Sequence, residues 1–70
     1  MKAEDFEISR SQLERLIDEW IFSERDRRIF KRRLLDGITY ERLAEEFDMS
    51  VRQIKNIVAR SEKAVYRHLW

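Results

Sequence analysis

The 70-residue chain has no cysteine, no proline, one glycine and one histidine. Without cysteine it can form neither disulfide bonds nor thiolate metal sites, which is compatible with a reducing compartment. A single histidine argues against a zinc site, and no nucleophile–base pair, metal cluster or phosphate loop can be assembled from these residues. We therefore expect a protein that is not an enzyme and needs no cofactor.

Long apolar runs are also absent. No segment approaches the roughly 20 apolar residues that a membrane span requires. The first five residues, MKAED, are too acidic for a signal peptide. These two observations predict a cytoplasmic protein without a membrane partner.

What the chain does have is 43% hydrophobic and 41% charged residues, which favours one small folded domain over disorder. The net charge of +1 hides a segmental pattern. Residues 1–22 carry −3, residues 23–37 carry +3, residues 38–50 carry −3 and residues 51–70 carry +4. Two basic segments can form a basic face suited to phosphate on a nearly neutral chain. A random scatter of charge is the alternative.

Apolar residues at helical spacing predict two helices in the first half of the chain. Ser9 and Gln12 form a capping box at the start of the first helix. Its apolar stripe consists of Leu13, Leu16, Ile17, Trp20 and Ile21. A second helix begins at Ser23 and stops near Gly37, because glycine favours helix ends.

Two further helices are predicted in the second half. Thr39 caps a short helix whose stripe is Tyr40, Leu43, Ala44 and Phe47. Ser50 and Gln53 form a second capping box, and the last stripe is Ile54, Ile57, Val58, Ser61, Val65 and Leu69. No segment shows the period-two alternation of a strand. The prediction is an all-α, four-helix domain over residues 9–70, preceded by an N-terminal arm over residues 1–8.

Residues 40–59 have the pattern of a helix-turn-helix, in which two helices cross steeply at a small residue. Ala44 is that small residue, and Met49 fills the turn. The turn commonly contains glycine in a left-handed conformation, and Asp48, which tolerates this conformation better than most residues, stands there. An ordinary helical hairpin is the alternative.

The stretch DGITYERLAEEFDMSVRQIKNI, residues 36–57, together with ERDRRIF, residues 24–30, resembles the C-terminal helix-turn-helix domain, region 4, of bacterial RNA polymerase sigma factors. The resemblance covers about residues 10–69, and LuxR-type regulators share much of the pattern. It implies a role in transcription. The helix matching residues 50–60 would read the promoter −35 element, and the domain would dock on the RNA polymerase core.

Departures from the family limit what this resemblance implies. The parts that recognise the −10 element and melt DNA are missing, so we do not expect a complete sigma factor. Val51, Arg52, Lys55 and Asn56 stand where housekeeping sigma factors often have arginine, glutamate, arginine and glutamine, so the target sequence does not carry over. In size the chain is similar to free-standing regulators of phages and mobile elements.

The fourth helix is predicted to provide most of the DNA contacts, because its apolar stripe leaves polar side chains facing outward. Arginine and lysine suit guanine, and asparagine and glutamine suit adenine. The predicted contact residues are Ser50, Val51, Arg52, Gln53, Lys55, Asn56 and Arg60. A merely solvated face is the alternative for the set. For two residues there is a further alternative to DNA contact. Gln53 would serve only in the helix cap, and Val51 would only support the turn.

Phosphate contacts are predicted from the second and third helices. Arg25, Arg28 and Arg32 lie at i, i+3 and i+7, where they can approach phosphates flanking the groove. Thr39 lies at a helix N-terminus, which favours anions. Helix solubility explains the arginines almost as well, and a plain cap explains Thr39 equally well.

The aromatic residues Trp20, Phe30, Tyr40 and Phe47 are expected in the core, because each falls on an apolar stripe. Trp70 either packs back on the first helix or meets a partner, which would indicate a homodimer. In a rival interpretation the same fold is a protein-binding module that contacts polymerase or a sigma factor. Its surface would then be acidic and consist of Glu14, Asp18, Glu41, Glu45 and Glu46.

Overall fold

The computed structural model describes residues 9–68, which form four helices and no strand. They are α1 (Arg10–Trp20), α2 (Glu24–Leu34), α3 (Tyr40–Phe47) and α4 (Val51–Tyr66). The predicted all-α fold, with four helices in this order, is therefore confirmed. The predicted arm over residues 1–8, and the predictions for Leu69 and Trp70, lie outside the described residues.

Every helix begins at a serine or threonine whose hydroxyl accepts a hydrogen bond from the amide three residues later. Such caps satisfy amides that have no partner within the helix. Both predicted capping boxes are present. At α4, the Gln53 amide donates to Ser50 Oγ at 3.1 Å, and the Ser50 amide donates to Gln53 Oε1 at 2.9 Å. The helix starts are thus encoded by local sequence.

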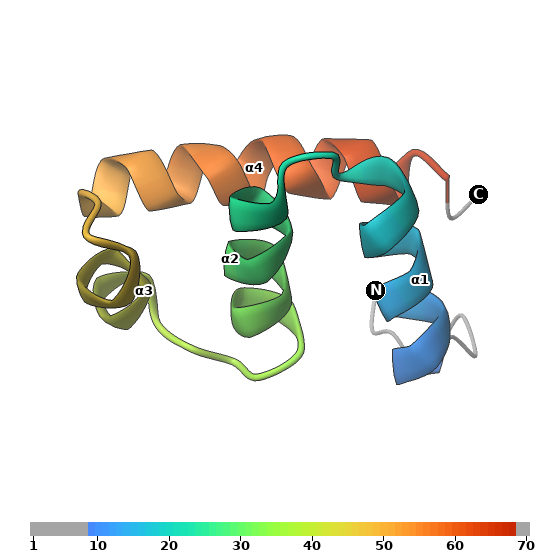
Figure 1. Ribbon diagram of the computed structural model, residues 1–70, viewed down its shortest axis with the longest axis horizontal. Helices are drawn as coiled ribbons and strands as arrows, with labels where there is room; N and C mark the ends of the chain where they lie inside the picture. The colour runs from blue at the N-terminus through green and yellow to red at the C-terminus, as the bar shows by residue number, and fades with distance from the viewer. Residues whose placement is uncertain (1–8, 69–70) are drawn as a thin grey trace.

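The longest helix, α4, runs along one side of the molecule, and the other three helices lie against it (Figure 1). The second helix also packs against each of the others, whereas α1 and α3 lie on opposite sides of it and make no contact within residues 9–68. None of these helices combines the length and apolar character that crossing a bilayer requires.

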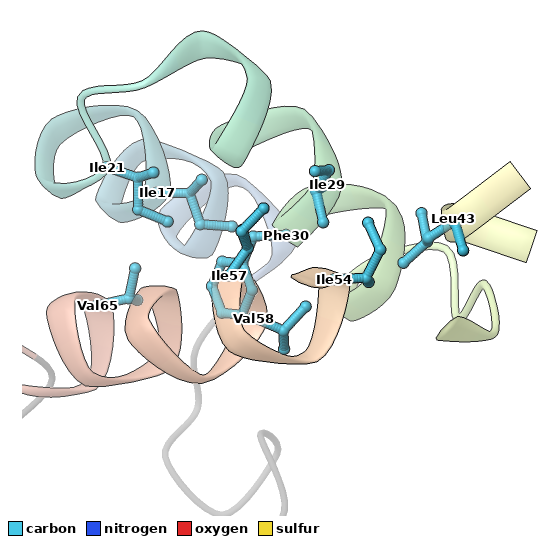
Figure 2. Close-up of a cluster of buried hydrophobic side chains, with 10 residues drawn as sticks. Ile17, Ile21, Ile29, Phe30, Leu43, Ile54, Ile57, Val58 and Val65 are labelled. Carbon is cyan, nitrogen blue, oxygen red and sulfur yellow. The ribbon is translucent and has the colours of Figure 1, made fainter. Parts of the chain in front are cut away.

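The core is one cluster to which every helix contributes, as Figure 2 shows. The members are Ile17, Ile21, Ile29, Phe30, Leu43, Ala44, Ile54, Ile57, Val58 and Val65. On α4 the buried positions recur three and four residues apart, and Ser61 is buried on the same stripe. The predicted stripe is confirmed as far as Val65, and the opposite side of α4 therefore faces solvent.

The predicted core position of Trp20 is wrong. Trp20 ends α1, and its side chain is 38% exposed and stacks on His68, with ring centroids 3.6 Å apart. The chain leaves the helix at Ile21, whose backbone is extended and whose side chain is buried, as the predicted stripe indicated. Phe30 is buried as predicted, while Tyr40 and Phe47 are half-buried against the core. Phe22, for which no pattern indicated a position, is 83% exposed.

Candidate nucleic-acid interface

The turn between α3 and α4 depends on Asp48, which has φ 54° and ψ 51° and so occupies the left-handed region. Its amide donates to Glu45 O at 3.4 Å, and the next amide, that of Met49, donates to Ala44 O at 2.9 Å. This pair of bonds is a Schellman motif, which ends a helix and reverses the chain sharply. The predicted left-handed conformation of Asp48 is confirmed.

The contact between α3 and α4 is close because Ala44 is small. Ala44 and Leu43 are the buried residues of α3, and they lie in one cluster with Ile54 and Ile57 of α4. In Figure 1, α3 lies beneath the N-terminal end of α4. Met49 packs against the edge of this cluster and fills the turn. Residues 40–59 therefore form the predicted helix-turn-helix.

The N-terminal half of α4 presents a polar surface to solvent. Five of the predicted contact residues are exposed on it, namely Arg52, Gln53, Lys55, Asn56 and Arg60. No acidic residue occurs from Val51 to Arg60. Within residues 9–68, none of the basic side chains of this helix forms an ion pair. Their charges therefore remain available to a ligand.

The other predicted residues of this surface have roles in the fold as well. Ser50 is exposed and caps α4, and the Oε1 atom of Gln53 is used in the same cap. Only the amide NH₂ of Gln53 is left to donate elsewhere. Val51 is half-buried and packs against the core cluster. Thr39 is exposed, and its hydroxyl accepts from the Arg42 amide at 3.2 Å.

Lys55 lies beside the start of α3. Its Nζ atom is 5.6 Å from the centroid of the Tyr40 ring, and the guanidinium of Arg33 is 4.3 Å from the same centroid. Cations over a tyrosine ring are attracted by its negative face. The half-buried ring of Tyr40 therefore brings a basic side chain of α4 close to the N-terminus of α3.

The structure distinguishes the three arginines of α2 that were predicted to approach phosphate. Arg25 is exposed, and its ion pair within the described residues is with the adjacent Asp26, at 3.2 Å. Arg32 makes a bidentate ion pair with Glu46 of α3, with N–O distances of 3.0 and 2.6 Å. The hydrogen bonds from Arg32 are the main reason that the pKa of Glu46 is lowered, and the same bonds raise the pKa of Arg32. Arg28 is exposed, has no ion pair within the described residues, and lies 5.9 Å from the centroid of the Phe47 ring.

The structure adds one basic residue to this surface that sequence reasoning left out. Lys63 lies on the exposed side of α4, two turns beyond Asn56, and lines the same open hollow as Asn56, Arg60 and Arg25. Its spacing of seven residues from Asn56 is the only sequence signal that places it on this side.

In a comparison with protein families, the model for "Sigma-70, region 4" matches residues 23–69 of the chain, about two thirds of its length. The match begins at Ser23, the cap of α2, and so includes α2, α3 and α4 but not α1. Comparisons with curated proteins and with solved structures gave no match.

Proposed function

The chain belongs to the sigma-70 region 4 family of DNA-binding transcription domains, and on that premise we propose that it is a sequence-specific transcriptional regulator. The N-terminal half of α4, from Ser50 onward, enters the major groove of duplex DNA in this proposal. Domains of this family bind DNA and the RNA polymerase core and are not enzymes. In this proposal the protein is not an enzyme and acts in the cytoplasm. It is a regulator of the kind that phages and mobile elements encode.

The observation that carries the proposal is the exposed polar surface of α4, in a helix-turn-helix, whose basic side chains form no ion pair within residues 9–68. The major groove, about 12 Å wide and 8.5 Å deep, admits an α-helix. Arg52 and Lys55 carry donors that suit the O6 and N7 atoms of guanine. Asn56 can donate to N7 and accept from N6 of adenine. Since the cap leaves Gln53 only its donors, Asn56 is the better candidate for adenine.

The rival function, a protein-binding module for RNA polymerase or a sigma factor, draws on the same family membership and on the acidic side chains. Several of these are already paired within the protein. Asp18 lies 2.8 Å from Lys31, Glu14 lies 3.8 Å from Arg10, and Glu46 is held by Arg32. Glu41 and Glu45 are the remaining exposed acidic side chains of the predicted surface. The surface left for a basic partner is therefore smaller than the sequence suggested.

Arg52→Ala and Asn56→Ala test the proposal. A preferred DNA site is first selected from a random duplex pool. Affinity for that site and for scrambled DNA is then measured for each variant at one salt concentration. Loss of a base contact typically costs about 1–3 kcal/mol of discrimination, a factor of about 5–150. Substitution of an exposed residue changes stability by less than about 0.5 kcal/mol. Both variants should therefore melt like the wild type and lose preference for the selected site.

Arg15→Ala is the matched control, because Arg15 is exposed on α1 and has no ion pair within the described residues. It removes the same charge far from the proposed reading surface and should leave the preference intact. If Arg52→Ala and Asn56→Ala bind both DNAs as the wild type does, α4 does not read bases. Pull-down of RNA polymerase by the wild type would then favour the protein-binding function.

A further inference from the structure

We propose that one strand of the DNA backbone lies in an open hollow beside α4, where Arg25, Arg60 and Lys63 contact its phosphates. The inference rests on the proposed function and adds phosphate contacts directly beside the side chains that read bases. The hollow has a volume of about 580 Å³. It is lined by Arg25, Met49, Gln53, Asn56, Ile57, Ala59, Arg60 and Lys63.

The length of α4 brings its second half to the edge of the groove. With 16 residues and a rise of about 1.5 Å each, the helix is about 24 Å long, roughly twice the width of the major groove. A helix that enters with its N-terminal end and crosses the groove therefore extends past it, toward the flanking phosphates. Arg60 and Lys63 follow Asn56 by four and seven residues, so they share its side of α4.

The charges around the hollow favour an anion. None of its lining residues is acidic. Arg60 and Lys63 form no ion pair within residues 9–68. Within the described residues, the one ion pair of Arg25 is with the adjacent carboxylate of Asp26, at 3.2 Å, and its side chain is 56% exposed. Three accessible cations on one hollow release counterions when they meet phosphates, which is the main source of affinity for a DNA backbone.

A second hollow, between α2 and α3, is a weaker candidate for the backbone. It has a volume of about 440 Å³ and is lined by Arg28, Lys31, Arg32, Glu46 and Phe47. Two of its three cations are already engaged, Lys31 by Asp18 and Arg32 by Glu46. A phosphate there would have to displace carboxylates and lie beside Glu46. In the hollow on α4, Arg25 alone of the three cations is paired within the described residues, and no acidic side chain is part of the lining.

The test is the salt dependence of binding to scrambled duplex DNA, measured between 50 and 200 mM NaCl for the wild type and for the Arg25→Ala/Lys63→Ala double variant. Each phosphate contact contributes about 0.9 to the slope of log K against log salt. Loss of two contacts should lower the slope by about 1.8, so that the loss of affinity over this range becomes about 12-fold smaller. The preference for the selected site over scrambled DNA should stay as in the wild type.

Two control variants separate contact from charge. Arg15→Ala lowers the net charge without touching the hollow and should keep the wild-type slope. Arg25→Lys/Lys63→Arg keeps both charges and should keep it too. A double alanine variant that has the wild-type slope, or that loses no more slope than Arg15→Ala does, would overturn the inference. If the wild type still prefers its selected site in that case, the proposed function stands. A wild type that binds no duplex would overturn both.

Discussion

Asp48 sets the direction in which α4 leaves α3, and it does so at a cost. The left-handed region places the Cβ atom of an L-residue close to the following carbonyl oxygen, at roughly 1–2 kcal/mol per residue. The side chain of Asp48 is exposed and makes no hydrogen bond within the described residues. Its negative charge also stands at the C-terminal end of α3, where the helix dipole disfavours anions. The side chain of Asp48 therefore does not stabilise the left-handed conformation of its backbone within the described residues.

Replacing Asp48 by glycine should therefore stabilise the domain by about 1 kcal/mol, because glycine adopts positive φ freely. Asp48→Val should destabilise it by about 1–2 kcal/mol, since a β-branched residue is strained there. Gly37→Ala is the reverse change and serves as the comparison, because it adds a Cβ atom at another residue with positive φ. Gly37 has φ +69° and open space around it, so an added Cβ meets only backbone strain. Urea unfolding measures all three. An Asp48→Gly variant less stable than the wild type would show that the carboxylate contributes a contact.

Between elements, the ion pair of Arg32 with Glu46 joins α2 to α3 and so holds the first helix of the motif in place. Asp36, two residues beyond the end of α2, extends this link. It lies 3.5 Å from Arg32 and 3.0 Å from Arg10 at the start of α1. The two partners in the main pair are 14 residues apart. Their contact follows from the packing of the helices and from no local pattern.

The difference between local contacts and contacts made by helix packing explains which parts of the structure the sequence could predict. The caps at Ser9 and Ser50, and the turn at Asp48, depend on neighbouring residues, and their prediction was confirmed. The partner of Arg32 and the exposed position of Trp20 depend on how the helices meet and where α1 ends, which helical spacing does not indicate. The predicted DNA contacts of α4 stay predictions, although the structure leaves their side chains exposed.

The link between α2 and α3 should make stability sensitive to acid. The pKa of Glu46 lies below its ordinary value of 4.5, chiefly because Arg32 donates hydrogen bonds to its carboxylate. A carboxyl group with a lowered pKa in the folded state stabilises the fold above its unfolded pKa, and this contribution is lost as the pH falls through the folded pKa. Below about pH 4.5, the melting temperature of the wild type should therefore fall more steeply than that of Glu46→Gln.

Glu45→Gln is the control for this measurement, because Glu45 is the exposed neighbour on α3 and has no ion pair within residues 9–68. Its melting temperature should follow the wild-type dependence on pH. Parallel curves for the wild type and Glu46→Gln would mean that the pair adds nothing to stability in solution, as is common for exposed ion pairs.

At the scale of the whole molecule, α1 lies outside the range that the family model matches, yet it belongs to the same core. Ile17 is fully buried, and Ile21 is 6% exposed, in one cluster with residues of α2, α3 and α4. A domain of about 60 residues buries only about 60% of the surface its unfolded chain exposes, so its stability is small. We infer that α2, α3 and α4, with the DNA-reading surface they support, need α1 to remain folded.

Ile17→Ala should accordingly destabilise the domain by about 2–5 kcal/mol, because it leaves a cavity where α1 packs on α2 and α4. If this variant is already unfolded, Ile17→Val, which costs about 0.5–1.5 kcal/mol, gives a measurable value. Phe22→Ala is the control. It removes a larger side chain from the same unmatched segment, but Phe22 is 83% exposed, so stability should change by less than about 0.5 kcal/mol. The midpoint of urea unfolding at 25 °C is measured for Ile17→Ala, Ile17→Val, Phe22→Ala and the wild type. Equal midpoints for Ile17→Ala and the wild type would show that α1 does not stabilise the domain. The Ile17→Ala variant should also lose DNA binding. If its remaining binding is proportional to the fraction of the protein that is folded, α1 acts through folding, because it contributes no residue to the proposed reading surface.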